Sequence, residues 1–140
     1  MTIGADWRIV RLMQPAIRVM MMPRDTNAHG TIFGGHILSL LDQAGAVAAH
    51  AIGARKVVTV AVREVVFKEP VHVGDIVSLY AEVTNVGSTS LTIRVRVEAH
   101  EPIGGRSVEV TTAELVYVQV DDRGRPVPIQ RTLPPRDAEC

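Results

Sequence analysis

The chain has 140 residues, a length that fits one domain with a substantial hydrophobic core. Its 15 basic and 15 acidic residues balance, so no overall charge favours binding to nucleic acid or to an anionic membrane surface. Apolar residues make up 46% of the chain, which is high for a small monomer. We therefore expect part of the surface to be buried between subunits of a homo-oligomer.

The sequence also bears on the cellular compartment. No apolar run reaches the length of a membrane-spanning helix, and no basic start followed by an apolar stretch resembles a signal peptide. The single cysteine is Cys140, which excludes a disulfide within one chain and a cysteine-based metal site. These features predict a cytoplasmic protein.

The chain begins with a lead-in over residues 1–15 that Pro15 closes, followed by a short strand over residues 16–23. Residues 24–35 are rich in glycine and polar side chains, which indicates a loop. A helix is predicted over residues 35–52, because the segment is rich in Leu and Ala, contains no proline and is followed by Gly53.

Four β-rich segments follow the helix, over residues 56–71, 75–86, 89–100 and 106–120. The third alternates clearly, with Ile93, Val95 and Val97 on one face and Arg94, Arg96 and Glu98 on the other. The connections are short and turn-like, which predicts antiparallel neighbours. The proline-rich, charged tail is expected to be loosely ordered after about residue 128. We found no internal repeat.

This order predicts an α+β fold in which an antiparallel sheet curls around one central helix. The helix is apolar nearly all round, so it should be surrounded by other structure. One stripe of the helix is expected to face the core, with Leu40 and Val47 beside it. Its members are Ile37, Leu41, Ala44, Ala48 and Ile52.

A second stripe of the helix combines small side chains with one carboxylate. It contains Gly35, Ser39, Asp42, Ala46 and Ala49. Small residues permit close approach either of another helix or of a slim ligand, and both interpretations remain open. Asp42 is a poor helix former, and a buried carboxylate is costly unless it is paired. It is either a structural acid bonded to a neighbour or a general base or nucleophile in a cleft.

Gly34 and Gly35 stand where the helix begins. The first amides of a helix have no partner inside it, and the helix dipole is positive there. Without side chains, these glycines would let a substrate oxygen approach, which would create an oxyanion site. Gly35 and Asp42 are about two turns apart and share a face, so a carbonyl and an attacking water would fit between them.

Other nucleophiles and ligand sets are less convincing. Ser39 lies inside the helix and lacks the strand-turn-helix context of a serine nucleophile. His29, His36 and His50 do not have the spacing of a metal-binding motif, so no metal or other cofactor is expected. Cys140 lies in the tail and is discounted as a nucleophile.

The combined pattern resembles a known family. The segment "MMPRDTNAHGTIFGGHILSLLDQAGAVAA" is similar to the signature of hotdog-fold acyl-CoA thioesterases of the bacterial YciA and brain acyl-CoA hydrolase type. There, a D-x-N-x-x-G-x-x-x-G-G segment leads into a helix carrying M/L-D-x-x-G. The corresponding residues here are Asp25, Asn27, Gly30, Gly34, Gly35, Asp42 and Gly45. The resemblance covers about residues 14–128 of a single domain, with residues 129–140 as a flexible tail.

The resemblance implies a hotdog fold and hydrolysis of acyl-CoA to a free acid and coenzyme A. It places Asp42 at the catalytic acid and Asn27, from the neighbouring subunit, at the catalytic asparagine. Coenzyme A is expected along the dimer interface, near the β-rich segment at Thr59 and Val60. The turn residues Gly87, Ser88, Thr89 and Ser90 should also approach it. Subunits should pair, and pairs often assemble into hexamers that are trimers of dimers.

Two departures from the family pattern stand out. Glu69 precedes Pro70 where relatives often have a basic residue, and His36 replaces an often bulkier, aromatic side chain. A hotdog dehydratase would need a His and Asp or Glu pair that the chain does not offer. The other alternative is a non-catalytic acyl-CoA-binding or sensor protein, which would usually carry a DNA-binding unit for which this chain has no room.

Overall fold

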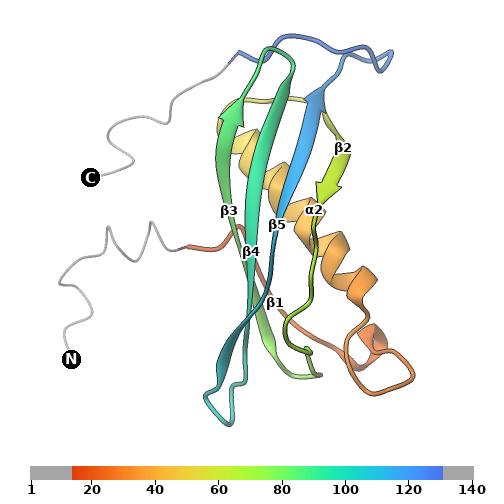
Figure 1. Cartoon of the computed structure of the whole chain (residues 1–140), viewed down its shortest axis with the longest axis vertical. Coiled ribbons are helices and arrows are strands. Elements are labelled where there is room, and N and C mark those ends of the chain that lie inside the picture. Colours follow the sequence, from red (N-terminus) through yellow and green to blue (C-terminus); the bar gives the residue numbers. More distant parts are fainter. Residues whose placement is uncertain (1–13, 131–140) are drawn as a thin grey trace, which may run out of the picture.

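The computed structural model describes residues 14–130 of the chain. In this part, one long helix, α2, lies along one face of a five-stranded antiparallel sheet with the strand order β1-β3-β4-β5-β2 (Figure 1). The elements are β1 Ile17–Met20, the short 3-10 helix η2 Pro23–Asp25, α2 Gly34–Ala51, β2 Val57–Arg63, β3 Ile76–Val86, β4 Ser90–His100 and β5 Ser107–Gln119. This arrangement agrees with the expected sheet curled against a central helix.

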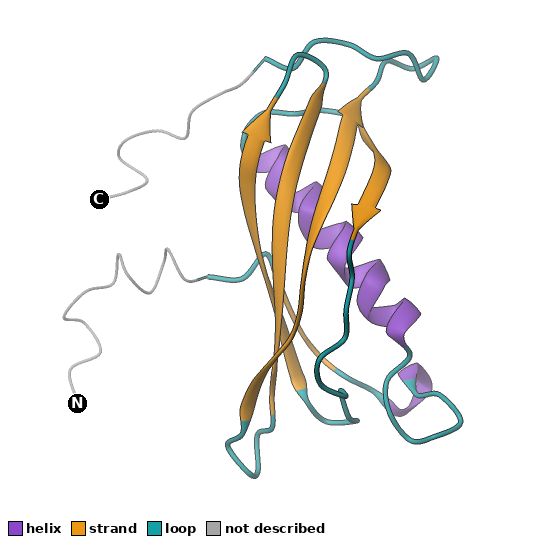
Figure 2. Cartoon of the chain, in the orientation of Figure 1, coloured by secondary structure: helices purple, strands orange, loops and turns teal. Residues whose placement is uncertain are grey.

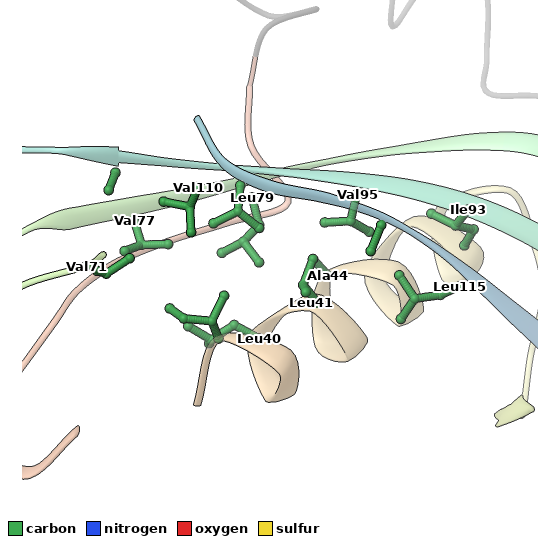
Figure 3. Close-up of a cluster of buried hydrophobic side chains, with 14 of the residues drawn as sticks. Leu40, Leu41, Ala44, Val71, Val77, Leu79, Ile93, Val95, Val110 and Leu115 are labelled. Carbon is green, nitrogen blue, oxygen red and sulfur yellow. The ribbon is translucent and has the colours of Figure 1, made fainter. Parts of the chain in front are cut away.

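Helix α2 is held on the sheet by its apolar side (Figure 3). Ile37, Leu40, Leu41 and Ala44 are all buried. They pack against inward-facing strand side chains, among them Val77, Leu79, Ile93, Val95 and Leu115. Gly53 ends the helix with a φ of +97°, a conformation that glycine adopts without strain. Burial of this apolar stripe against the sheet fixes the direction in which the remaining helix residues point.

The three long strands β3, β4 and β5 lie side by side in the sheet (Figure 2), and successive side chains of β4 alternate between buried and more exposed positions. Ile93, Val95 and Val97 face the helix and are fully buried, which confirms the predicted alternation. On the opposite face, Arg94 lies directly across from Glu82 of β3 and from Glu114 of β5 in the strand register. Oppositely charged neighbours are favourable on an exposed sheet face.

Strand β2 is shorter than the sequence predicts. The segment over residues 56–71 was expected to be one strand, but β2 ends at Arg63. Glu64 then takes a φ of +43°, which turns the chain away from the sheet. Beyond this turn, the amide of Lys68 still donates to the carbonyl of Val110 at 2.8 Å. The apolar residues of this segment instead cover the first turn of α2, where Val71 is buried.

The faces of α2 differ from the expectation in two places. Val47, expected beside the core, is 48% exposed, whereas Ala49, expected on the small-residue stripe, is fully buried. The reason is that a single sheet covers only one side of the helix, so the outer side, which includes Leu38, is open within one chain. The valines of the edge strand β2 are similarly exposed, namely Val58, Val60 and Val62.

The end of the described chain returns to the sheet. The amide of Ile129 donates to the carbonyl of Ser88, and the side chain of Gln119 donates to the carbonyl of Pro128, both at 2.8 Å. The remainder of the expected tail, from residue 131, and most of the expected lead-in lie outside the described residues. Between residues 14 and 130, no helix is both long and apolar enough to cross a membrane.

Candidate active site

The loop before α2 is closed by Asp25. Its side-chain Oδ2 accepts a hydrogen bond from the amide of Met22 at 3.0 Å, and its carbonyl accepts one from the amide of Phe33 at 2.9 Å. His36, in the first turn of α2, places its Nε2 3.6 Å from the same Oδ2. Asp25 therefore ties both ends of the loop to the start of the helix.

Asn27 shapes the middle of this loop. Its Oδ1 accepts hydrogen bonds from the amides of His29 at 2.8 Å and Thr31 at 3.2 Å, and its Nδ2 donates to the hydroxyl of Thr31 at 2.8 Å. None of these bonds reaches Asp42 of the same chain. The Nδ2 group has a second hydrogen that takes no acceptor among the described residues, so it is available to another group.

The N-terminus of α2 presents free amides. The amides of His36 and Ile37 donate to the carbonyl of Phe33, whereas those of Gly34 and Gly35 have no acceptor in the described part of the chain. A Cβ on Gly35 would meet nothing within 4 Å, so the space beside this residue is open. Two unpaired amides at the positive end of a helix can stabilise an oxyanion.

A mostly apolar hollow of about 360 Å³ lies beside these amides. Its wall includes Gly34, Ile37, Phe67 and Val71. The ring of Phe67 is close to the helix, because a Cβ on Gly34 would be 3.3 Å from its Cε2 atom. The glycine at position 34 thus makes room for an aromatic side chain that forms one side of the hollow.

Asp42 projects from the middle of α2 toward the edge strand β2. The hydroxyl of Thr59 donates to Oδ1 of Asp42 at 2.5 Å. The phenol of Tyr117 donates to the backbone carbonyl of Asp42 at 2.7 Å and lies 3.2 Å from the same Oδ1. The carboxylate is half-buried, and its Oδ2 takes no hydrogen bond from any described residue. One carboxylate oxygen is therefore held by hydroxyl groups, and the other has no donor among the described residues.

Tyr117 was not predicted from the sequence. It lies on β5 directly opposite Thr59 and is only 1% exposed. Burial raises the pKa of its phenol far above the ordinary value, and the charge of Asp42 raises it further. The signal in the sequence was an inward-facing polar aromatic residue in a strand of aliphatic residues, because a buried phenol needs a hydrogen-bond partner.

Gly45 allows this contact. A Cβ at this position would be 2.1 Å from the hydroxyl oxygen and 2.7 Å from Cζ of Tyr117. No side chain fits at such distances, so the phenol can reach the carbonyl of Asp42 only if position 45 is glycine. The glycine three residues after the acid thus has a steric role.

The predicted coenzyme A residues lie at one end of the sheet. Thr59 pairs with Tyr117, which pairs with Leu91 of β4, the residue that follows the turn over residues 87–90. Val60 lies at an irregularity in the pairing of β2 with β5 and is 56% exposed. The structure therefore brings Thr59 to Asp42, whereas no hydrogen bond among the described residues joins the turn to Asp42.

The backbone of the turn over residues 87–90 is partly engaged. The amide of Gly87 donates to the carbonyl of Ser90 at 2.7 Å. The carbonyl of Thr89 accepts from the amide of Gln119, and that of Ser88 from the amide of Ile129, both at 2.8 Å. The amides of Ser88 and Thr89 take no acceptor in the described part of the chain, so a ligand at this turn could meet backbone donors as well as side chains.

Other residues singled out in the sequence have local partners. Glu69 lies 3.4 Å from Arg106, so the acid that departs from the family pattern is paired with a base of the same chain. Ser39 accepts a hydrogen bond from Gln43, and no histidine among the described residues forms a hydrogen bond with it, which does not support a serine triad. Among residues 14–130, no cluster of three or more His, Cys, Asp or Glu could hold a metal ion. Cys140 lies outside the described residues.

A long helix against a curled antiparallel sheet, with an acid directed at the edge strand, defines the hotdog class of domain. The sequence matches the thioesterase superfamily over residues 29–105, and the chain belongs to this family. It is 44% identical over 122 residues to the acyl-CoA thioester hydrolase YciA of Escherichia coli, an alignment that covers 84% of this chain and 89% of that protein. The resemblance seen in the sequence is therefore confirmed.

Solved structures support the same assignment. A hexameric hotdog-fold thioesterase of Campylobacter jejuni superposes with a TM-score of 0.79 at 44% identity, covering 85% of this chain and 92% of that one. An acyl-CoA hydrolase of Staphylococcus aureus, solved with butyryl coenzyme A and coenzyme A, gives a TM-score of 0.73 at 30% identity. That superposition covers 88% of this chain and 75% of the other. The predicted hotdog fold is confirmed.

Proposed function

We propose that the protein hydrolyses acyl-CoA thioesters to a free acid and coenzyme A, with Asp42 as the catalytic carboxylate. The observation that carries the proposal is the geometry of Asp42, which stands half-buried on α2 with one oxygen anchored by Thr59 and the other unoccupied. The acyl-CoA hydrolase activity of the relatives agrees with this chemistry.

The free amides of Gly34 and Gly35 supply the oxyanion site. They lie on the same helix as Asp42 and about two turns before it, which leaves room for a thioester carbonyl. When a nucleophile attacks the carbonyl carbon, negative charge develops on the oxygen, and an amide at the positive end of the helix stabilises it. The C–S bond then breaks, and the coenzyme A thiolate leaves and takes a proton.

The role of the carboxylate has two forms. As a general base, Asp42 removes a proton from a water molecule that attacks the carbonyl carbon. As a nucleophile, its oxygen attacks the carbon directly, and water then hydrolyses the resulting mixed anhydride. Both forms use the same unoccupied oxygen, and neither needs a metal ion.

We place Asn27 in the site of a neighbouring subunit. Within its own chain, its Oδ1 and one Nδ2 hydrogen are used by the loop, so the loop holds the side chain in a fixed position. The second Nδ2 hydrogen can then donate to the attacking water or to the substrate carbonyl of the adjacent subunit.

Exposed apolar side chains support a site shared between subunits. The outer side of α2 and the edge strand β2 leave Leu38, Val47, Val58, Val60 and Val62 exposed within one chain. An edge strand with apolar side chains is a natural place for a second subunit to bind. We propose a homo-oligomer from a dimer to a hexamer, with coenzyme A near Thr59, Val60 and the turn over residues 87–90.

The test is thiol release from a series of acyl-CoAs, from acetyl to palmitoyl, with a carrier-protein thioester as the control. Asp42→Asn keeps the shape of the side chain but removes the base and the nucleophile, so turnover should fall by at least about 100-fold while acyl-CoA still binds. Wild-type turnover in Asp42→Asn would refute the mechanism. Binding of acyl-CoA without turnover by the wild-type protein would support the sensor alternative.

A further inference from the structure

We propose that Tyr117 is a positioning residue that contacts Oδ1 of Asp42, beside the hydroxyl of Thr59, and so leaves Oδ2 as the reacting oxygen. The proposal rests on the function proposed above and specifies how its carboxylate is held. It assigns Tyr117 a part in the reaction.

The hydrogen bonds of Asp42 are strongly asymmetric. Oδ1 accepts from the hydroxyl of Thr59 at 2.5 Å and lies 3.2 Å from the phenol of Tyr117. These two groups belong to directly paired residues of β2 and β5, so their side chains lie on the same face of the sheet and contact the same oxygen. Oδ2 has no such donor among the described residues. A carboxylate held in this way presents one particular oxygen, and its orientation is fixed before the substrate binds.

The phenol of Tyr117 is also fixed. It is 1% exposed and donates to the backbone carbonyl of Asp42 at 2.7 Å, so it contacts both the main chain and the side chain of the same residue. Because burial and the charge of Asp42 both raise its pKa, the phenol stays protonated and remains a donor through the neutral and mildly alkaline range.

Gly45 shows that the helix accommodates this contact. Any Cβ at position 45 would overlap the Tyr117 hydroxyl, and glycine is otherwise less favourable than alanine inside a helix. Gly45, a weak helix former, thus stands at the position where the phenol of Tyr117 contacts the helix. This accounts for the glycine of the D-x-x-G motif, to which the hydrolytic mechanism itself gives no role.

The first experiment compares Tyr117→Phe with Tyr80→Phe. These are the only two tyrosines, and the Tyr80 hydroxyl contacts Arg18 and not Asp42. In folded Tyr117→Phe we expect kcat for a short acyl-CoA to fall by about tenfold or more with KM changed less than about twofold, because a bond to a charged group is lost in the reacting complex. Tyr80→Phe should match the wild type. A wild-type kcat in folded Tyr117→Phe would overturn the proposal.

The second experiment uses Thr59. Thr59→Val removes the hydroxyl with little change of shape and should lower kcat, whereas Thr59→Ser restores a donor and should recover most of that loss. Equal activity of the serine and valine variants would contradict an anchoring hydroxyl. Asp42→Asn distinguishes a failure of the proposed function from a failure of the positioning inference. If it retains turnover, the proposed function fails; if it is inactive while Tyr117→Phe and Thr59→Val turn over normally, only the positioning inference fails.

Discussion

Gly45 and Tyr117 occupy adjoining space so closely that a single methyl group on the glycine would stand 2.1 Å from the tyrosine hydroxyl oxygen. The contact joins the middle of α2 to β5, the strand next to the edge of the sheet. The helix therefore has a residue without a side chain where it meets the phenol that contacts Asp42, and this relationship can be tested directly.

Gly45→Ala should destabilise the protein by about 1–3 kcal/mol, because overpacking in a buried contact outweighs the gain in helix propensity. Turnover should also fall, since the phenol must move away from Asp42. Chemical denaturation and thiol-release kinetics measure the two effects. Unchanged stability and turnover in Gly45→Ala would show that Tyr117 can leave its position at no cost.

Gly35→Val should lower turnover by about 100-fold, because the side chain would hinder approach to the unpaired amides at the start of α2. The space around Gly35 is open, so the loss should occur without a large change in melting temperature. Gly34→Ala gives a useful comparison, since its Cβ would press on Phe67 at 3.3 Å and should affect packing as well. Near-normal turnover in folded Gly35→Val would remove Gly35 from the site.

Asn27→Asp keeps the acceptor that holds the loop but replaces the amide donor, so it should reduce turnover with less damage than truncation. Mixing Asn27→Asp subunits with Asp42→Asn subunits, by co-expression, tests whether the site is shared. If one subunit supplies the asparagine and the other the acid, some mixed pairs carry both changes in one site and leave the other site intact. Activity should then partly recover, and no recovery at any mixing ratio would argue against a shared site.

Val62→Lys should weaken assembly, because it puts a charge on the exposed edge strand β2 where a second subunit is proposed to bind. Ile103→Lys is the matched control, since Ile103 is 98% exposed in the β4–β5 turn. Sedimentation at micromolar concentration should show smaller species for Val62→Lys and the wild-type distribution for Ile103→Lys. The same distribution for both variants would place the interface elsewhere.

Stability should decline at alkaline pH because of Tyr117. Its pKa is raised on folding, so its contribution is fully present below the ordinary value of 10.0 and is lost as the pH rises toward the folded value. The free energy of unfolding of the wild type should therefore fall above about pH 10, and this part of the decline should be absent in Tyr117→Phe. Parallel stability curves for the two proteins above pH 10 would contradict this assignment.

The sequence was sufficient for the helix, the glycine-rich loop and the acid, because each leaves a local signal in composition or spacing. It missed Tyr117, since that contact depends on the register between β2 and β5 and on the absence of a side chain at Gly45. The end of β2 at Arg63 was also missed. The residues after it include Val65, Val66 and Phe67, which favour β-structure, and the strand ends at the left-handed backbone of Glu64, which composition does not reveal.

The orientation of α2 was predicted in part. Ile37, Leu41 and Ala44 were placed correctly in the core. Val47 and Ala49 were exchanged, because spacing along a helix defines stripes but not which stripe a one-sided sheet will cover. The choice depends on side-chain volume at the contact, where a small residue lets helix and sheet approach closely.

Asp42 and Tyr117 are 75 positions apart in the chain. During synthesis the helix with its acid leaves the ribosome well before β5 is complete, and β2 has no neighbour in the sheet until β5 pairs with it. Any nascent or truncated chain that lacks β5 therefore contains the acid without Tyr117 and without the strand partner that holds Thr59 in place. Hydrolytic competence is consequently acquired in the last stage of folding, when the penultimate strand of the sheet closes over the helix.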